Sequence, residues 1–151
     1  MDTIEPLTMP LVERALKAGS YNYMIDSDGD YRINYDTETS LGHLNLVVSI
    51  GGERKDLFRL YGWFDHKIPE ARLSQAIYFC NQYHRNYLFP TLYVVISEED
   101  NVRKGRFWVQ QTFDLEKGIH QEGLLNFMRM FVGGCISFHK WVLKEPETWL
   151  T

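Results

Sequence analysis

The acidic run Asp26-Ser27-Asp28-Gly29-Asp30 contains the residue types and spacing that could bind a cation. A calcium loop of the EF-hand type uses such carboxylates, but it also needs glycine at its sixth position and glutamate at its twelfth. Counting from Asp26, those positions hold Tyr31 and Thr37. A tight Asp-Gly turn between two strands accounts for the same residues. We therefore predict a hairpin turn here and no metal site.

The cysteines and histidines lack the spacing of a metal or nucleophilic site. No two of the five histidines are spaced as metal ligands, and Cys80 with His84 would need two further ligands. We predict that Cys80 and Cys135 are buried reduced thiols and that His84 lies at the edge of the core with a hydrogen-bond partner. The chain also lacks a Gly-x-Ser-x-Gly elbow and a phosphate-binding glycine loop. We predict no catalytic residue, cofactor or metal, and an enzyme with an unrecognised site is kept as an alternative.

One basic segment gives a second alternative, regulation through nucleic acid. Residues 104–109 match the RNP1 strand of RNA-binding domains in part, but Arg106 replaces its first stacking aromatic and Gln111 its last. Arg103, Lys104, Arg106 and Trp108 are the candidate surface for this alternative. The net charge of −4 and the pI near 5.7 disfavour binding to nucleic acids or anionic membranes.

Composition indicates a globular protein with surplus aromatic surface. The 151 residues fit one domain covering 1–151, with 44% apolar residues and an unusually high 15% of aromatics. The acidic N-terminus has no apolar segment typical of a signal peptide. No run has the roughly 18–20 apolar residues that a membrane span needs. We therefore expect a cytoplasmic protein.

Hydrophobic periodicity and turn residues predict nine elements in the order α-β-β-β-β-α-β-β-α. The predicted helices cover residues 8–19, 69–86 and 122–144. The predicted strands cover residues 21–25, 31–35, 43–50, 56–64, 91–97 and 106–113. Most connections are hairpins, so the fold class is α+β, an antiparallel sheet with helices packed on it. We expect the core stripe of the second helix to contain Leu73, Ala76, Ile77, Cys80 and His84.

The last predicted helix, residues 122–144, has more apolar residues than one side of a surface helix needs. Its main stripe should pack on the sheet; it consists of Leu124, Met128, Phe131, Cys135, Phe138 and Val142. The flanking residues Phe127, Val132, Ile136 and Trp141 are left to contact either the other helices or a second subunit. Gly133 and Gly134 should allow close approach midway along the helix.

Aromatic residues also occur on the strand faces opposite the predicted core. Tyr61, Trp63, Tyr93 and Trp108 alternate with polar residues there, and Tyr78 lies opposite the core stripe of the second helix. Exposed Trp and Tyr among polar groups is the composition of a protein interface. We predict that these five residues contact a protein partner or a second copy of the chain.

Over residues 7–143 the chain resembles the YbjN family of bacterial proteins. The resemblance is carried by Leu60-Tyr61-Gly62-Trp63, Pro69-Glu70-Ala71-Arg72-Leu73, Ile77-Tyr78-Phe79-Cys80-Asn81, Asn86 and Phe89-Pro90-Thr91-Leu92-Tyr93-Val94. The Asp28-Gly29-Asp30 turn and the long last helix fit as well. Tyr83-His84-Arg85 departs from the family, which usually has Trp-Asn-Arg there.

The resemblance implies a fold similar to type III secretion chaperones, which are homodimeric proteins without enzymatic activity that bind other proteins. Members of the family are described as sensory transduction regulators. The expected function is therefore a non-enzymatic, homodimeric module that binds an unknown protein partner and has a regulatory role.

Overall fold

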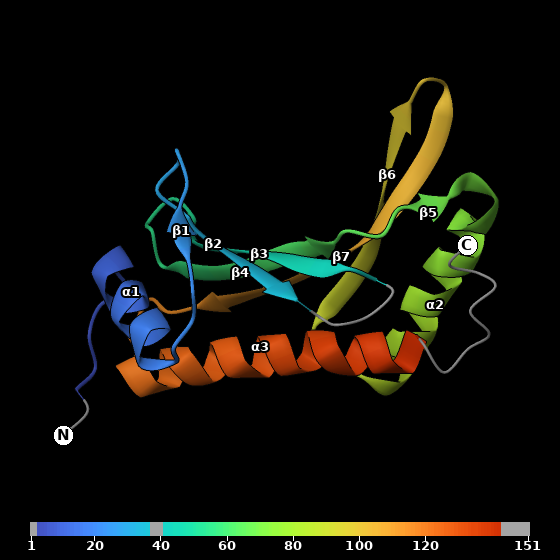
Figure 1. Cartoon of the computed structure of the whole chain (residues 1–151). Helices are drawn as coiled ribbons and strands as arrows, with labels where there is room; N and C mark the ends of the chain where they lie inside the picture. The colour runs from blue at the N-terminus through green and yellow to red at the C-terminus, as the bar shows by residue number, and fades with distance from the viewer. Residues whose placement is uncertain (1–2, 37–40, 143–151) are drawn as a thin grey trace.

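The computed structural model describes residues 3–36 and 41–142 of the chain. Figure 1 shows a twisted antiparallel sheet, α-helices packed on it and a β-hairpin that projects away from the rest of the molecule. In chain order the elements are α1 (Met9–Ala18), β1 (Met24–Ile25), β2 (Tyr31–Asp36), β3 (His43–Gly51), β4 (Leu57–Phe64), β5 (Ile68–Pro69), the 3-10 helix η1 (Glu70–Arg72), α2 (Leu73–Asn86), β6 (Thr91–Glu99), β7 (Val102–Asp114) and α3 (Gln121–Val142).

The predicted α+β class and element order are confirmed, with two differences in the strands. The seven-stranded sheet has the order β1-β2-β3-β4-β7-β5, and β6 pairs with β7. The two-residue strand β5 and the turn η1 precede α2, where the sequence predicted a helix from residue 69. Strand β1 is shorter than predicted because residues 19–21 close helix α1, with the Tyr21 amide donating to the Leu16 carbonyl at 3.0 Å.

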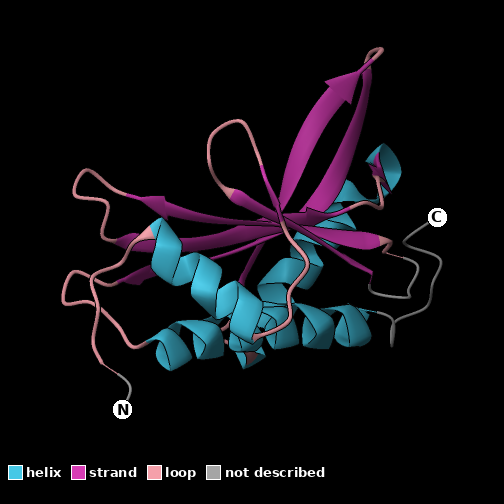
Figure 2. Cartoon of the chain, turned by 60° about the vertical axis from the view of Figure 1, so that its left-hand side comes forward, coloured by secondary structure: helices cyan, strands magenta, loops and turns pink. Residues whose placement is uncertain are grey.

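All three helices pack on one face of the sheet, as the two views in Figures 1 and 2 show. Helix α1 begins at the predicted cap, because the Thr8 hydroxyl accepts a hydrogen bond from the Leu11 amide at 3.3 Å. Its buried residues Leu11, Val12, Ala15 and Leu16 join the same hydrophobic core as α2, α3 and the inward side chains of β2, β3, β4 and β7.

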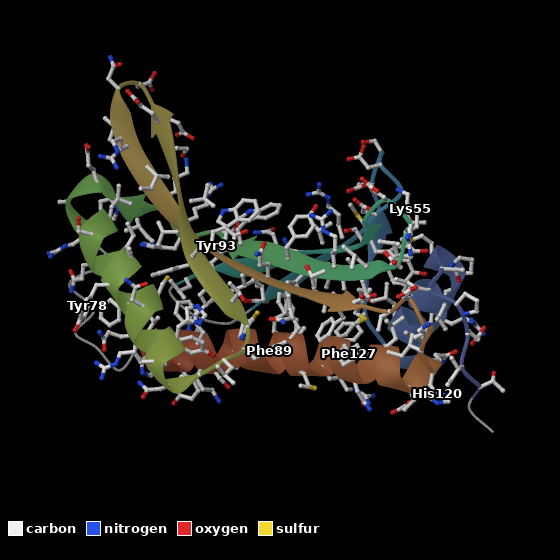
Figure 3. The ribbon with its side chains drawn as sticks, turned by 180° about the vertical axis from the view of Figure 1, so that it is seen from behind. Lys55, Tyr78, Phe89, Tyr93, His120 and Phe127 are labelled. Carbon is white, nitrogen blue, oxygen red and sulfur yellow. The ribbon has the colours of Figure 1, made fainter. Side chains whose placement is uncertain are left out.

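Most of the apolar residues of helix α3 pack against other parts of the same chain. All six residues of its predicted main stripe are buried, and Val132 is buried as well. Phe127 stacks on Phe113 of β7 with ring centroids 3.9 Å apart, as Figure 3 places it between α3 and the sheet. Trp141 packs edge-on against Phe79 of α2 at 5.5 Å. Val132 is thus covered within the chain, whereas Phe127, Ile136 and Trp141 are half-buried and keep part of their surface open.

The predicted core stripe of α2 is wrong at one position. Ile77 is 43% exposed, whereas Phe79 and Tyr83 are buried together with Leu73, Ala76 and Cys80. Rings from α3 cause the difference, because Phe138 and Trp141 pack against Tyr83 at 5.5 and 5.8 Å. The buried side of α2 therefore turns toward α3, and Ile77 is left on the outer side.

Candidate protein-interaction surface

The sheet face opposite the helices, here called the outer face, has no helix of the described chain over it (Figures 1 and 2). Strand register brings its aromatic residues together. Trp63 of β4 lies opposite Trp108 of β7, and Trp108 lies opposite Tyr93 of β6. The outward side chains of three consecutive strands therefore form one row across the sheet, and Tyr61 follows Trp63 on the same face of β4.

These four residues are here called the aromatic face, and three of them form a row of ring contacts. The Trp63 and Trp108 rings are stacked, with centroids 5.0 Å apart and planes 28° apart. Tyr93 lies 6.3 Å from Trp108, and its hydroxyl contacts the Gln110 amide oxygen at 3.3 Å. All four are half-buried, so each ring keeps part of its surface open to solvent. The structure thus assembles four of the five residues that the sequence predicted for partner contact.

Two arginines lie over this aromatic face, and neither was among the predicted contact residues. The Arg32 guanidinium is 6.0 Å from the Trp63 ring, and that of Arg59 is 5.6 Å from the Tyr61 ring. Both sit at outward positions of their strands, so alternation within β2 and β4 could have placed them on this face. Their contact with the rings depends on strand register, which a single sequence does not provide.

The arginines and Tyr61 also explain why two outward residues of β3 are buried. Val47 lies between Arg32 and Tyr61 in the register, and Ser49 lies opposite Arg59. Val47 is 1% exposed and Ser49 is 5% exposed. Long neighbouring side chains therefore cover short ones on the outer face, and the surface available to a partner consists of the rings, the guanidinium groups and nearby amides.

An open pocket of about 380 Å³ adjoins the aromatic face near β1 and β2. Trp63, Arg32 and the amide side chains of Asn34 and Asn45 contribute to its wall. Asn34 donates a hydrogen bond to the Asn45 side-chain oxygen at 3.2 Å, and Asn45 donates to the Asp65 carboxylate at 2.7 Å. The pocket thus combines one aromatic wall with fixed polar groups, an arrangement that suits a side chain of a protein partner.

Tyr78, the fifth predicted contact residue, lies on a different surface. It is 58% exposed on α2 and points away from the sheet, as Figure 3 shows by its position relative to Tyr93. Together with Phe79 and Trp141 it lines a second open pocket of about 420 Å³. Its rings and the neighbouring side chains of Gln75, Gln82 and Asn86 form a mixed aromatic and polar surface on α2, here called the α2 surface. The structure therefore separates the predicted contact residues into two groups.

The acidic run forms a turn, as predicted. The Asp26 carboxylate accepts hydrogen bonds from the amides of Asp28 and Asp30 at 2.9 and 3.0 Å. It also pairs with Arg32 at 2.9 Å, and this arginine is the main cause of the lowered pKa of Asp26. Carboxylate oxygens of the three aspartates lie within 4.8 Å of one another. The bonds that Asp26 makes within the turn account for this grouping.

The two cysteine thiols are buried and have raised pKa values, whereas a catalytic thiol is accessible and has a lowered pKa. Both are buried, and burial raises the pKa of Cys80 to about 12 and the pKa of Cys135 further in the same direction. His84, four residues after Cys80, bonds to the backbone of β6: its Nε2 accepts a hydrogen bond from the Leu92 amide at 3.0 Å. This agrees with the predicted core-edge histidine.

The partial RNP1 match does not form a stacking strand. Phe107 is 1% exposed and belongs to the core, so its ring cannot stack on a base. Trp108 does face outward, but it is already stacked on Trp63. In addition, none of the described helices has both the length and the apolar character to cross a bilayer.

Comparison with known proteins identifies the family. A search of curated proteins gave no match. A solved structure of YbjN from E. coli, described as a putative transcription regulator, is similar in fold with a TM-score of 0.69 and 8% sequence identity. The match covers 90% of this chain and 91% of that one. The family model for YbjN, a putative bacterial sensory transduction regulator, matches residues 10–144. The chain therefore belongs to the YbjN family.

Proposed function

We propose that this YbjN-family chain is a non-enzymatic regulatory protein that acts by binding another protein at the aromatic face. The observation that carries the proposal is the uncovered outer sheet face, on which Trp63, Trp108 and Tyr93 form a contacting row. Aromatic and arginine side chains dominate binding energy at protein interfaces. Arg32 and Arg59 lie over the same rings, so this composition is concentrated at one place.

The rigidity of the aromatic face favours binding a preformed partner. Stacked rings and cation–π contacts fix the side chains before a partner arrives, which lowers the entropy that binding must remove. The hydrogen-bonded amides at the edge of the face supply groups that can fix the partner's orientation. A rim of this kind around aromatic residues is the usual arrangement of protein interfaces.

Assembly of two chains is the second part of the proposal. We assign it to the α2 surface, where Tyr78 is 58% exposed beside Phe79 and Trp141. Tyr78 lies apart from the aromatic face, so a homodimer formed there leaves the outer sheet face free for a partner. The resulting molecule would resemble a secretion chaperone in its architecture, and we expect it to act in the cytoplasm.

Substitution of Trp108 by glutamate tests the partner-binding face. Trp108→Glu removes the ring shared by Trp63 and Tyr93 and adds a charge, and the half-buried position lets the carboxylate reach water. In quantitative pull-downs from the native organism, a specific protein should co-purify with wild type and be lost with Trp108→Glu. Loss of a central aromatic contact costs about 2 kcal/mol or more, which corresponds to roughly thirtyfold in affinity.

Ser137→Glu is the matched control, because Ser137 is exposed on α3, a helix that packs on the sheet face opposite the aromatic face. It adds the same charge and should leave capture unchanged. Circular dichroism should show both variants folded. If every captured protein is retained by Trp108→Glu, or lost equally with Ser137→Glu, the aromatic face is not the binding site.

A further inference from the structure

Strand β6 forms one edge of the sheet along its whole length. It pairs with β7 in an unbroken antiparallel register from Thr91 opposite Gln110 to Glu99 opposite Val102, and it has no second partner among the described strands. Figures 1 and 2 show the β6–β7 hairpin rising away from the rest of the sheet. Its side chains become more exposed along the strand, from buried Leu92 through half-buried Tyr93 and Val94 to five exposed residues.

One hydrogen bond shows which backbone groups of β6 face outward. The Leu92 amide donates to His84 Nε2 on helix α2 at 3.0 Å, so it is directed away from β7. In an antiparallel pair, residues alternate between those that exchange both backbone bonds with the partner strand and those whose N–H and C=O point the other way. Because the register is unbroken, Val94, Ile96 and Glu98 share the orientation of Leu92.

Helix α2 closes the edge at Leu92, but the following residues are left open. In the described part of the chain, the N–H and C=O groups of Val94, Ile96 and Glu98 have no hydrogen-bond partner on this side. Edge strands are usually protected from pairing by proline, inward charges or a bulge. From Val94 to Ser97, β6 has none of these, and Val95 and Ile96 are each 38% exposed. The first charged residue is the exposed Glu98, at the end of this open segment.

We propose that the open edge of β6, from Val94 to Glu98, binds an extended segment of a protein partner, which adds to the sheet as a further strand. The backbone determines the class of ligand, because a row of alternating donors and acceptors is complemented by another extended chain. The proposal rests on the proposed function in that the ligand is a protein, but it uses a different surface from the aromatic face.

Side chains beside the edge define the segment further. Tyr93 and Val95 lie on the outer face, in continuity with Trp108, whereas Val94 and Ile96 face the other side. A strand added here would therefore have apolar residues on both faces near Val95 and Ile96. Toward the tip, Glu98 has Arg103 opposite it on β7, and an added strand would complement it with a basic residue on its open side. The expected ligand is an extended apolar segment with a basic residue at the end near Glu98.

Peptide selection combined with amide exchange tests the proposal. The probes are random peptides with the nine-residue length of β6, selected from a displayed library on the intact protein and then synthesised. Before peptide is added, the amides of Val94, Ile96 and Glu98 should exchange faster than those of Val95 and Ser97. Bound peptide should slow exchange at Val94, Ile96 and Glu98, because those amides then donate to the added strand.

Ile96→Pro removes one outward N–H without removing a hydrogen bond to β7, so it should leave the hairpin folded. It should weaken peptide binding about tenfold or more, whereas Ile96→Ala, which keeps the N–H, should weaken it much less. The N–H of Glu98, two residues further along β6, also points outward. Glu98→Pro is therefore the second proline variant if Ile96→Pro disturbs the fold. Equal losses from proline and alanine, or selected peptides that leave these three amides unprotected, would overturn the proposal.

The same peptides separate this proposal from the proposed function. Peptides that lose affinity with Ile96→Pro and keep it with Trp108→Glu show edge binding independent of the aromatic face. Peptides that respond to Trp108→Glu alone contradict edge pairing and support the aromatic face.

Discussion

The two buried thiols carry a stability effect that depends on pH. Burial raises the pKa of Cys80 from 9.0 to about 12, so the folded thiol stays protonated where the unfolded one ionises. The contribution of Cys80 to stability is complete below pH 9 and is lost as pH rises from 9 toward 12, because the unfolded chain then gains stability by releasing a proton. Urea unfolding at pH 8 and pH 10 should show a lower midpoint at pH 10.

The variant Cys80→Ala isolates this effect, because it removes the titrating group from both states. It should be less stable than wild type at pH 8, by a few kcal/mol at most for a small side chain. Its further loss between pH 8 and pH 10 should be smaller than that of wild type. An identical loss in the two proteins would show that other groups cause the pH dependence.

At the scale of elements, the two adjacent glycines of α3 have different roles. A Cβ at Gly133 would meet no atom within 4 Å, whereas one at Gly134 would lie 2.7 Å from the Pro90 ring. Gly133→Ala should therefore stabilise the protein by about 0.5–1 kcal/mol through helix propensity. Gly134→Ala should destabilise it by about 1–3 kcal/mol, because the loop before β6 must move. Chemical denaturation of both variants checks this, and equal effects would contradict the packing of α3 on that loop.

Sequence periodicity predicted the elements well because most of them have one buried side. The main stripe of α3 follows directly from its spacing, and the outward alternation of β4 and β7 placed Trp63 and Trp108 correctly. Errors arose where tertiary contacts decide burial. Ile77 was misplaced because rings of α3 pack against the other side of α2. Val47 does lie on the outward side of β3, but it is buried because Tyr61 and Arg32 flank it in the register. Such neighbours come from distant parts of the sequence.

The candidate site shows the same division between local and long-range information. Alternation along single strands was enough to select Tyr61, Trp63, Tyr93 and Trp108 as outward residues. Grouping Tyr78 with them required the relative positions of α2 and the sheet, and the structure places Tyr78 on a separate surface. The open edge of β6 also escaped sequence analysis, because it depends on strand order and on the bond between His84 and Leu92.

At the scale of the whole molecule, the aromatic face and the α2 surface are separate, so partner binding and dimer formation should be lost in different variants. If the α2 surface joins two chains, light scattering should give the mass of a dimer at micromolar concentration, and Tyr78→Glu should give the 17.8 kDa monomer. The charge would be buried against the apolar residues of the second copy, which costs several kcal/mol without a partner. Trp108→Glu, on the aromatic face, should remain dimeric. A wild-type monomer would exclude the homodimer, and a dimer that resists Tyr78→Glu but dissociates with Trp108→Glu would place the contact on the outer sheet face instead.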